Sequence, residues 1–427
     1  MSLEWQDVVL KDVLSEKGYI RGPFGSALKR SEMKSEGIPV YEQQNAIYNN
    51  RSFRYYIDDD KYQSLKRFTT VTDDLIISCS GTVGKVSIIK ENDPKGIISQ
   101  ALLTLRVNKE LILPEFLKYF FSSYEGYNSL VSRSTGSVQV NISKRAVIEE
   151  IPLKLPPLDI QRNIVYYLQL IDAKIENCNS INKNLTEASD ILHKEFIQSI
   201  DTNDFCYYSD VKELGTIIMG QSPKGETYNY DNIGLPLING AADYENGYLK
   251  AQKYTTDPKK TCNKNDLIFC IRATIGLLVI CDKEYCLGRG VAGITNINPL
   301  YKEYAFHLIN SSIEKFKRDA TGSVFGEIVK KDIEEIPVKI LKEDNIRKYH
   351  AIQKPIFDKL ENNRIEIDNL IKLRDLLLPK LMSGEIDVSK INCDLSYNNR
   401  AQNMNAKNRF HNPKIKKAPK PPKSSLS

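Results

Sequence analysis

The side chains best able to make specific polar contacts in this sequence are amides and guanidinium groups between residues 41 and 56. Amides and guanidinium groups can form paired hydrogen bonds with the edges of nucleic-acid bases. We interpret five of these residues as candidate nucleic-acid contacts, although for each one alone a solvated protein face is an equally good explanation. They are Gln43, Gln44, Asn45, Arg51 and Arg54.

Cations and hydroxyls near glycines form a second group of candidates, suited to phosphate groups, which position a protein on DNA without carrying sequence information. In the first third of the chain they are Arg21, Lys29 and Arg30 beside the loop Gly22-Pro23-Phe24-Gly25, and Thr135, Gly136, Ser137, Gln139 and Lys144. In the second half the copy of the Thr-Gly-Ser loop is Thr321, Gly322 and Ser323, and the polar candidates comparable to those of the first domain, for bases or phosphates, are Gln221, Lys224, Asn239, Arg272 and Arg289.

Catalytic patterns are weak throughout the sequence. The four histidines, His193, His307, His350 and His411, are isolated in the sequence, so we interpret them as core or surface residues. Gly81-Thr82-Val83-Gly84-Lys85 lacks the spacing of a phosphate-binding loop and predicts a tight turn between strands.

Three further patterns are also better explained without catalysis. Asn298-Pro299-Leu300-Tyr301 resembles the catalytic tetrapeptide of amino-methyltransferases, but it lacks the second proline and is interpreted as a turn. Glu327, Asp332, Glu334 and Glu335 are interpreted as a solvated acidic face. A zinc site at Cys262, Cys270, Cys281 and Cys286 is an alternative with the wrong spacing, so reduced thiols are expected. We predict no catalytic residue, no metal site and no cofactor in this chain.

A long helix is predicted for the stretch after Leu155-Pro156-Pro157-Leu158. Its apolar positions step by four and three, a 3.5-residue period typical of a coiled coil. The predicted seam is Ile164, Leu168, Ile171, Ile175, Cys178, Asn182, Leu185, Ser189, Leu192 and Phe196. Such a helix would be roughly 60 Å long and needs a partner helix in water.

The partner helix is predicted in the same chain, because the same stepping returns from Ile356 to Leu381 and stops at Ser383-Gly384. Its seam is Ile356, Leu360, Asn363, Ile367, Leu370, Arg374, Leu377 and Leu381. Two unrelated amphipathic surface helices are the alternative. Ile340 to Asn345 replace the Leu-Pro-Pro-Leu start, and Pro355 is expected to begin or kink this helix.

The segments before the two helices predict mixed α+β domains that repeat each other. Short β-type runs such as Asp74 to Cys79 alternate with turns, and Pro114 to Ser123 predicts a helix. Six short motifs recur in the same order, from Gly22-Pro23-Phe24-Gly25 and Gly220-Gln221-Ser222-Pro223 to Glu149-Glu150-Ile151-Pro152 and Glu334-Glu335-Ile336-Pro337. The offset between copies shrinks from 198 to 185, as expected for one duplicated unit with small deletions.

The predicted organisation is therefore domain, helix, domain, helix. We predict domains at 1–152 and 203–337, coiled-coil helices at 153–202 and 338–388, and a basic, disordered tail at 389–427. If the helices pack antiparallel, the two domains are related by a pseudo-two-fold axis, which matches the symmetry of double-stranded DNA.

The composition of the chain indicates where the protein is located and how its charge is distributed. The net charge is +6, but the last 27 residues hold seven cations and no acid, so residues 1–400 carry −1. Any DNA-binding surface on the body must therefore come from local clustering. No apolar run has the length of a membrane span and no secretion signal starts the chain, so we expect a cytoplasmic protein that does not bind a membrane.

Taken together, these motifs resemble the specificity subunit of type I restriction-modification systems, over roughly residues 5–390. The resemblance rests on Gly22 to Lys29, Gly37 to Val40, Asp74 to Ile76, Gly81 to Gly84 and the Thr-Gly-Ser loops. Leu155 to Leu158 with Gln161, and Leu378 to Ile386, complete it.

The resemblance implies two target recognition domains, each binding one half of a bipartite double-stranded DNA target, and helices that set the spacer. It also implies two modification (methyltransferase) subunits and restriction subunits as partners, which would use S-adenosylmethionine, ATP and Mg. The alternatives are a self-sufficient, divergent DNA methyltransferase or nuclease, and a coiled-coil scaffold unrelated to DNA.

Overall fold

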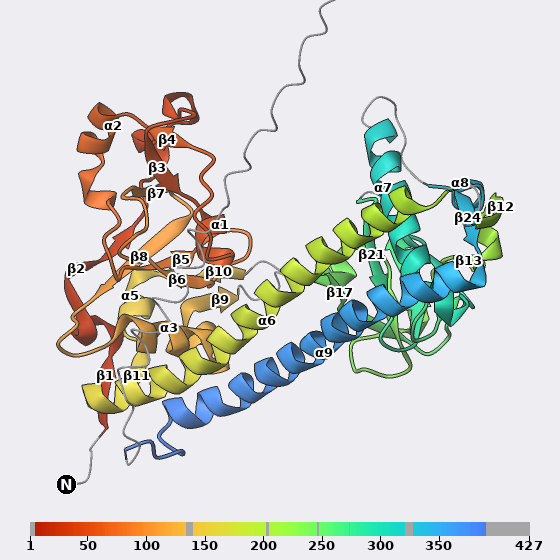
Figure 1. Cartoon of the computed structure of the whole chain (residues 1–427). Helices are drawn as coiled ribbons and strands as arrows, with labels where there is room; N and C mark the ends of the chain where they lie inside the picture. The colour runs from red at the N-terminus through yellow and green to blue at the C-terminus, as the bar shows by residue number, and fades with distance from the viewer. Residues whose placement is uncertain are drawn as a thin grey trace, which may run out of the picture. The chain divides into compact units, whose positions relative to one another are not determined.

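The computed structural model describes residues 5–133, 140–201, 205–245, 247–272, 274–320 and 328–389 (Figure 1). They form two compact units, one of residues 1–175 with 369–427 and one of residues 176–368. Each unit therefore contains one mixed domain and a part of each long helix.

The domain of the first unit is built on a four-stranded antiparallel sheet in the order β2-β8-β5-β6. These strands are β2 (Leu14–Arg21), β5 (Leu75–Ser78), β6 (Val86–Ile88) and β8 (Leu102–Val107). A three-stranded sheet, β4-β3-β7, joins β3 (Ile38–Tyr41) to β4 (Tyr56–Ile57) and, in parallel, to β7 (Ile97–Ile98). Two strand pairs complete the domain, β1 (Gln6–Val9) with β11 (Pro152–Leu155) and β9 (Val131–Arg133) with β10 (Val140–Ile142).

Short helices cover these sheets. They are α1 (Gln43–Ile47), α2 (Asp59–Ser64), α3 (Pro114–Ser122), α4 (Tyr124–Leu130) and α5 (Arg145–Glu149). The predicted helix from Pro114 is confirmed as α3, whose proline occupies its first turn, where a missing N–H is tolerated. Phe116 and Phe121 of this helix are buried in the core with Leu103 and Leu105 of β8.

The domain of the second unit repeats this topology. Its four-stranded sheet has the order β13-β23-β20-β21, with β13 (Thr216–Met219), β20 (Leu267–Cys270), β21 (Gly276–Ile280) and β23 (Val291–Thr295). A five-stranded sheet contains β14 (Tyr228–Asn229), β18 (Lys253–Thr255), β15 (Leu235–Ile238), β22 (Tyr285–Leu287) and β19 (Thr261–Cys262). The pairs β12 (Phe205–Asp210) with β24 (Pro337–Leu341) and β16 (Tyr244–Glu245) with β17 (Tyr248–Leu249), and the helices α7 (Lys302–Ala320) and α8 (Lys330–Glu334), complete it.

The two long helices are α6 (Leu158–Ser199) and α9 (Glu343–Met382). In both units they run antiparallel: Asp172 contacts Arg374 in the first, and in the second Asn182 contacts Asn363 and Ser189 contacts Gln353. Every residue of the two predicted seams is buried or partly buried, which confirms the 3.5-residue pattern. The alternative of unrelated surface helices is therefore wrong.

The expectation that α9 begins at Pro355 is wrong. The helix begins at Glu343, well before Pro355, and continues through the proline. The end is as predicted, because α9 stops at Met382 and Gly384 follows with φ +79°, a conformation that favours glycine.

The sequences at the starts of α6 and α9 differ, and each start is held by a different polar contact. Gln161 of α6 is fully buried, accepts a hydrogen bond from the Leu113 amide and donates to the Pro156 carbonyl. Ile346 takes the place of Gln161 in α9, and the Tyr301 hydroxyl donates at 3.0 Å to the carbonyl of Leu341, the counterpart of Pro156. A tyrosine from the domain thus replaces a glutamine from the helix.

Candidate nucleic-acid interface

Four loops converge at one edge of the domain in the first unit, and we call this the first four-loop site. They hold residues 21–25, 42–43, 79–81 and 99–101. The Gly22 amide donates at 3.0 Å to the Leu102 carbonyl, the Ser99 amide at 2.8 Å to Tyr41, and the Cys79 amide at 2.8 Å to Ala101. A Cβ at Gly22 would lie 2.0 Å from the Ser99 carbonyl oxygen, so only glycine lets these loops approach so closely.

The second unit holds the same arrangement, the second four-loop site, at residues 219–223, 239–241, 271–272 and 288–290. Its backbone bonds correspond one for one: Gly220 to Val291 at 3.0 Å, Gly288 to Ile238 at 2.8 Å and Ile271 to Gly290 at 3.0 Å. Six of the residues that surround its pocket of about 370 Å³ are Ser222, Asn239, Gly240, Arg272, Arg289 and Gly290.

The structure brings together six of the residues predicted from the sequence. Arg21 and Gln43 lie at the first four-loop site, and Gln221, Asn239, Arg272 and Arg289 at the second. Arg21 ends β2 and its guanidinium lies 5.7 Å from the ring centre of the exposed Phe24. Arg272 and Arg289 are both exposed, on loops that follow β20 and β22.

Buried polar atoms without hydrogen-bond partners mark the first four-loop site. The described residues contain six such side-chain atoms, and four lie here: Arg21 Nη1, Glu42 Oε2, Gln43 Oε1 and Ser99 Oγ. Leaving a buried polar group unpaired costs about 1–3 kcal/mol, so such atoms are rare in a folded protein. Glu42 and Ser99 are not among the residues predicted from the sequence, because the sequence pattern singles out amides, cations and glycine-flanked hydroxyls, and neither residue belongs to these classes.

Asn45 and Arg51 require a correction, because they lie inside the first domain with their polar atoms occupied. Asn45 is fully buried, accepts from the Glu42 amide at 2.7 Å and donates to the Ser52 carbonyl at 3.1 Å. Arg51 forms an ion pair of 2.7 Å with Asp93 and donates at 2.9 Å to the Ile88 carbonyl. Both residues shape the loop that follows α1 instead of facing a ligand.

The remaining described candidates lie on the surface outside the four loops or at their margins. The guanidinium groups of Arg30 and Arg54 both contact the ring of Tyr55, with their central carbons 5.8 and 4.7 Å from the ring centre. Gln44 donates to the Ser52 carbonyl at 3.2 Å. Lys29, Lys144 and Lys224 are exposed. Thr135, Gly136, Ser137, Gln139, Thr321, Gly322 and Ser323 lie outside the described residues.

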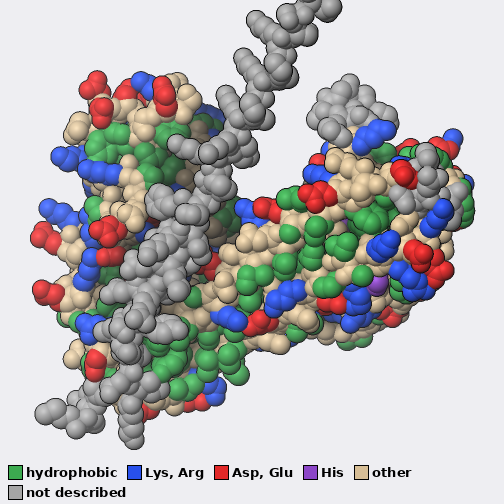
Figure 2. Space-filling view, in the orientation of Figure 1, with side chains coloured by type: hydrophobic (Ala, Val, Ile, Leu, Met, Phe, Trp, Pro, Cys, Tyr) green, Lys and Arg blue, Asp and Glu red, His purple; other side chains and the backbone are tan. Residues whose placement is uncertain are grey.

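Charge does not mark either domain as a whole as a DNA-binding surface. Acidic and basic side chains are interspersed over the face drawn in Figure 2, as expected from the charge of −1 on residues 1–400. Within the four-loop sites the balance differs: the first holds Arg21 and Glu42, whose carboxylate pairs with Arg54 at 2.7 Å, and the second holds two arginines. Local clustering thus supplies a cationic site in the second unit.

Burial controls the ionisation of groups below the first four-loop site. It raises the pKa of the Cys79 thiol to about 11, an effect that the nearby Arg21 cation opposes. Burial, with the neighbouring Asp93 carboxylate, also raises the pKa of the Tyr41 hydroxyl to about 12. Both groups are therefore neutral at physiological pH, and the charged side chains at this edge are Arg21, Glu42 and the Arg54 that pairs with Glu42.

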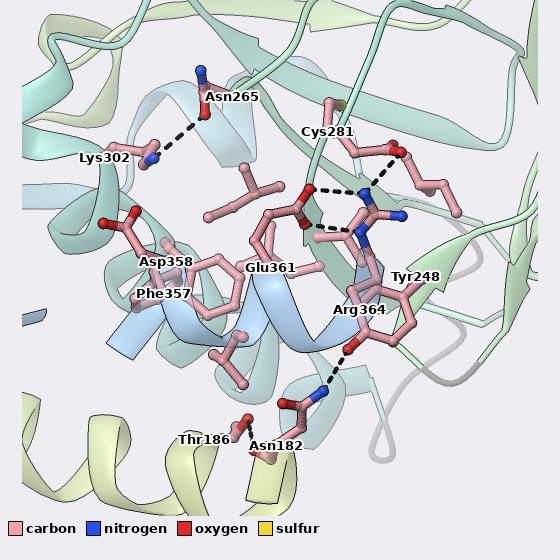
Figure 3. A pocket seen from close by; sticks show the side chains of 18 of the residues that line it. Asn182, Thr186, Tyr248, Asn265, Cys281, Lys302, Phe357, Asp358, Glu361 and Arg364 are labelled. Carbon is pink, nitrogen blue, oxygen red and sulfur yellow. Dashed lines mark hydrogen bonds and ion pairs between the residues drawn. The ribbon is translucent and has the colours of Figure 1, made fainter. Parts of the chain in front are cut away.

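In each unit the domain rests on the helix pair through a polar network. In the first unit the Tyr119 hydroxyl of α3 donates at 2.7 Å to Asp172 of α6, which pairs at 3.1 Å with Arg374 of α9. In the second, a pocket of about 580 Å³ lies between β21, α7 and the two long helices. There Asn182 of α6 donates to the Tyr248 hydroxyl (Figure 3), and Arg364 of α9, which also pairs with Glu361 of its own helix, pairs at 3.4 Å with Asp282 of the domain.

Two histidines that are isolated in the sequence meet in the second unit. The rings of His193 and His307 stack with centres 4.6 Å apart. Ser189 Oγ lies 2.9 Å from His307 Nε2, and Asp190 Oδ1 lies 3.3 Å from Nδ1. This resembles a serine, histidine and acid triad, but Ser189 is 2% exposed and donates its hydroxyl hydrogen to Gln353. The two histidines are core residues, as interpreted from the sequence.

The other chemical patterns have structural explanations. Gly84, with φ +80°, closes the turn between β5 and β6, and Asn298 caps a short 3₁₀ helix by accepting from the Leu300 amide. Cys262, Cys270, Cys281 and Cys286 are buried, with burial raising the pKa of Cys270 to about 11. Across the described parts of the chain, no three histidine, cysteine or acidic side chains are grouped as metal ligands. Glu334 and Glu335 pair with lysines on the surface of α8.

Within the described ranges, no helix has both the length and the apolar character needed to span a membrane.

Comparison with known proteins identifies relatives along most of the chain. The family model described as type I restriction modification DNA specificity domain matches twice, at residues 3–187 and 207–373. A putative type I restriction enzyme MjaX specificity subunit from Methanocaldococcus jannaschii is 27% identical, over 78% of this chain and 83% of its own length. The MjaIX specificity subunit of the same organism is 23% identical, over 67% of this chain and 72% of its own.

The fold has a counterpart among solved structures. The S subunit of a type I restriction-modification system from M. genitalium matches with a TM-score of 0.52 at 15% identity, over 91% of this chain and 98% of that one. The family match does not support the alternatives of a self-sufficient enzyme or an unrelated scaffold. With two specificity domains that repeat one topology and two long helices between and after them, the chain belongs to the family of type I restriction-modification DNA specificity subunits.

Proposed function

We propose that each of the two domains binds one half of a bipartite double-stranded DNA target through its four-loop site. The observation that carries this proposal is the repetition of the site: two domains present the same four loops, joined by corresponding backbone hydrogen bonds. Two equivalent surfaces suit a duplex, because its two strands run in opposite directions and offer related half-sites.

The antiparallel helices would set the spacer between the two half-sites and bind two modification subunits, with restriction subunits joining the assembly in a cytoplasmic complex. The continuous lengths of α6 and α9 and their polar seam contacts support this role, since buried asparagines on a seam specify helix register. A fixed register would keep the spacer constant.

The chain itself would not be an enzyme. Among the described residues, packing accounts for the histidines and cysteines, and turns and caps account for the candidate catalytic motifs. S-adenosylmethionine, ATP and Mg would be used by the partner subunits. Methylation of an adenine would require flipping of that base into the partner's active site.

Reconstitution tests this proposal. The chain mixed with its modification subunit and S-adenosylmethionine should methylate genomic DNA at one bipartite motif, and the chain alone should transfer no methyl group. The modification subunit alone serves as the control and should show no methylation at that motif. Methyl transfer by the isolated chain, or a motif with a single continuous block, would contradict the proposal.

A further inference from the structure

The two four-loop sites share a backbone but differ in their side chains. Their backbone hydrogen bonds define six equivalent positions, because Gly22 corresponds to Gly220, Cys79 to Ile271 and Leu102 to Val291. The pairs are Arg21 and Met219, Glu42 and Asn239, Gln43 and Gly240, Ser80 and Arg272, Ser99 and Gly288, and Gln100 and Arg289. All six pairs differ, whereas the glycines that let the loops meet, Gly22 and Gly220, are the same.

The side chains of the two sites differ in whether they accept or donate hydrogen bonds. The first site offers acceptors: Glu42 Oε2 and Gln43 Oε1 have no hydrogen-bond partner in the described structure, while the other oxygen of Glu42 pairs at 2.7 Å with Arg54. The second offers two exposed guanidinium groups, on Arg272 and Arg289, around a pocket of about 370 Å³. Five donors in a planar fork make arginine suited to two adjacent acceptors.

Space also differs between the sites. In the second, a Cβ at Gly240 would meet no heavy atom within 4 Å, and the position stands open beside Asn239. In the first, Gln43 fills the equivalent position, with its amide nitrogen near Gly81. The second site is therefore open at the position that Gln43 occupies in the first.

Base edges in the major groove distinguish these two chemistries. Guanine presents the adjacent acceptors N7 and O6, which pair with arginine, whereas adenine and cytosine present an exocyclic amino group, which pairs with an amide or a carboxylate. Acceptors in the first site and cations in the second thus fit different bases.

We propose that the second four-loop site recognises guanine through Arg272 and Arg289, and that the first recognises adenine or cytosine, whose exocyclic amino group faces the major groove, through Glu42 and Gln43. This inference rests on the proposed function, because it names the bases that the two sites distinguish. The two halves of the DNA target then differ in sequence, although one backbone design binds both.

The experiment uses the full chain in complex with its modification subunit. The methylated motif is first determined for the wild type, and duplexes are made in which 7-deazaguanine replaces each guanine of one half-site, which removes the N7 acceptor. Binding is measured for the wild type, for Arg272→Ser and Arg289→Gln, which introduce the first site's residues, and for Lys331→Gln. The last variant removes a positive charge on α8, outside the site, and is the matched control.

For the wild type and Lys331→Gln, 7-deazaguanine at one position should weaken binding about 5- to 100-fold, the discrimination expected of one arginine and guanine pair. For Arg272→Ser or Arg289→Gln the loss of affinity caused by 7-deazaguanine should shrink to less than about 2-fold, because each variant lacks an arginine that would bind N7. Glu42→Gln and Gln43→Gly should change base preference only in the other half-site.

Two results would overturn the inference. One is equal sensitivity to 7-deazaguanine in the wild type and in both arginine variants. The other is a half-site without any G·C pair in the motif that the arginine variants affect. Neither result is the failure of the proposed function, which would appear as the absence of bipartite methylation by the wild-type complex.

Discussion

At the scale of single residues, buried polar groups in this protein divide into those that hold loops and those left without partners. Asn45 and Arg51 belong to the first kind, because every bond they make is internal. Arg21, Glu42, Gln43 and Ser99 belong to the second, each with one buried atom lacking a partner among the described residues. The first kind contributes to stability, and the second is available for a ligand.

Asn45 should therefore be a stability residue. Asn45→Ala removes the acceptor of the Glu42 amide and the donors to the following loop, so the free energy of unfolding should fall by about 1–3 kcal/mol. Gln44→Ala is the matched control, because its amide donates to the same Ser52 carbonyl from a more exposed position, and it should cost less than about 1 kcal/mol. Urea denaturation measures both, and equal losses would contradict the structural role of Asn45.

The stacked histidines predict a dependence of stability on pH. Burial lowers the pKa of His193 and of His307 to about 4, from 6.5, and for His193 the neighbouring His307 adds to the effect. Between pH 6.5 and 4 the unfolded chain thus binds more protons than the folded one, so stability should fall as the pH is lowered through this window.

The expected loss between pH 7 and 5.5 is about 2–3 kcal/mol for the pair. Denaturation at several pH values in low salt measures it, and His307→Gln should reduce the slope by roughly half, because one of the two groups is gone. Stability that rises as the pH drops from 7 to 5.5 would show that these histidines are charged in the fold.

At the scale of elements, the polar residues of the helix seam are as informative as its leucines. Asn363 donates to Asn182 at 2.7 Å, and Asn182 donates to the Tyr248 hydroxyl of β17, so a helix, its partner and a strand share one network. Ser189, Gln353 and His307 form a second network about two turns along α6. A slip of either helix would leave these groups buried and unpaired, which favours one register.

Replacing Asn182 and Asn363 singly and together should show how strongly the two side chains are coupled. Asn363→Leu alone leaves the Asn182 oxygen without its donor and should cost about 1–3 kcal/mol. Asn182→Leu with Asn363→Leu should cost less than the sum of the two single changes, because both members of the pair are then apolar. A double-mutant cycle measured by thermal unfolding gives the coupling energy, and strictly additive losses would contradict a direct interaction.

At the scale of the whole molecule, one duplicated unit has produced two domains with matching loops and two helices of 42 and 40 residues. The duplication conserves what folding requires, such as the glycines at the loop crossings, while the exposed side chains of the loops differ. Even the helix starts, which differ in sequence, keep one hydrogen bond to the carbonyl before the helix, from Gln161 or from Tyr301.

Helix length should set the spacer of the target. Inserting one heptad into α6 after Ile175 and one into α9 after Asp368 preserves the seam and lengthens each helix by about 10 Å. The unmethylated spacer should then grow by about three base pairs, while both half-site sequences stay the same. Methylation mapping of the reconstituted complex measures the spacer, and an unchanged spacer, or altered half-sites, would contradict the role of the helices. Inserting the heptad in α6 alone is the control and should abolish methylation, because the seams no longer match.

Local patterns in the sequence determined the elements of this protein. The heptad seams, the α3 helix, the strands around Leu75 and Leu102 and the glycine end of α9 depend on periodicity, proline and glycine, whose effects act within a few residues. The internal repeat likewise predicted a duplicated fold. Only the tertiary structure decided which polar residues face a ligand, because burial depends on neighbours distant in the chain. Asn45 lies only two residues from Gln43, yet Asn45 is enclosed by its own loop, whereas the side chain of Gln43 lies near Gly81. Arg272 and Arg289 come together only because β20 and β22 end at the same edge of the domain.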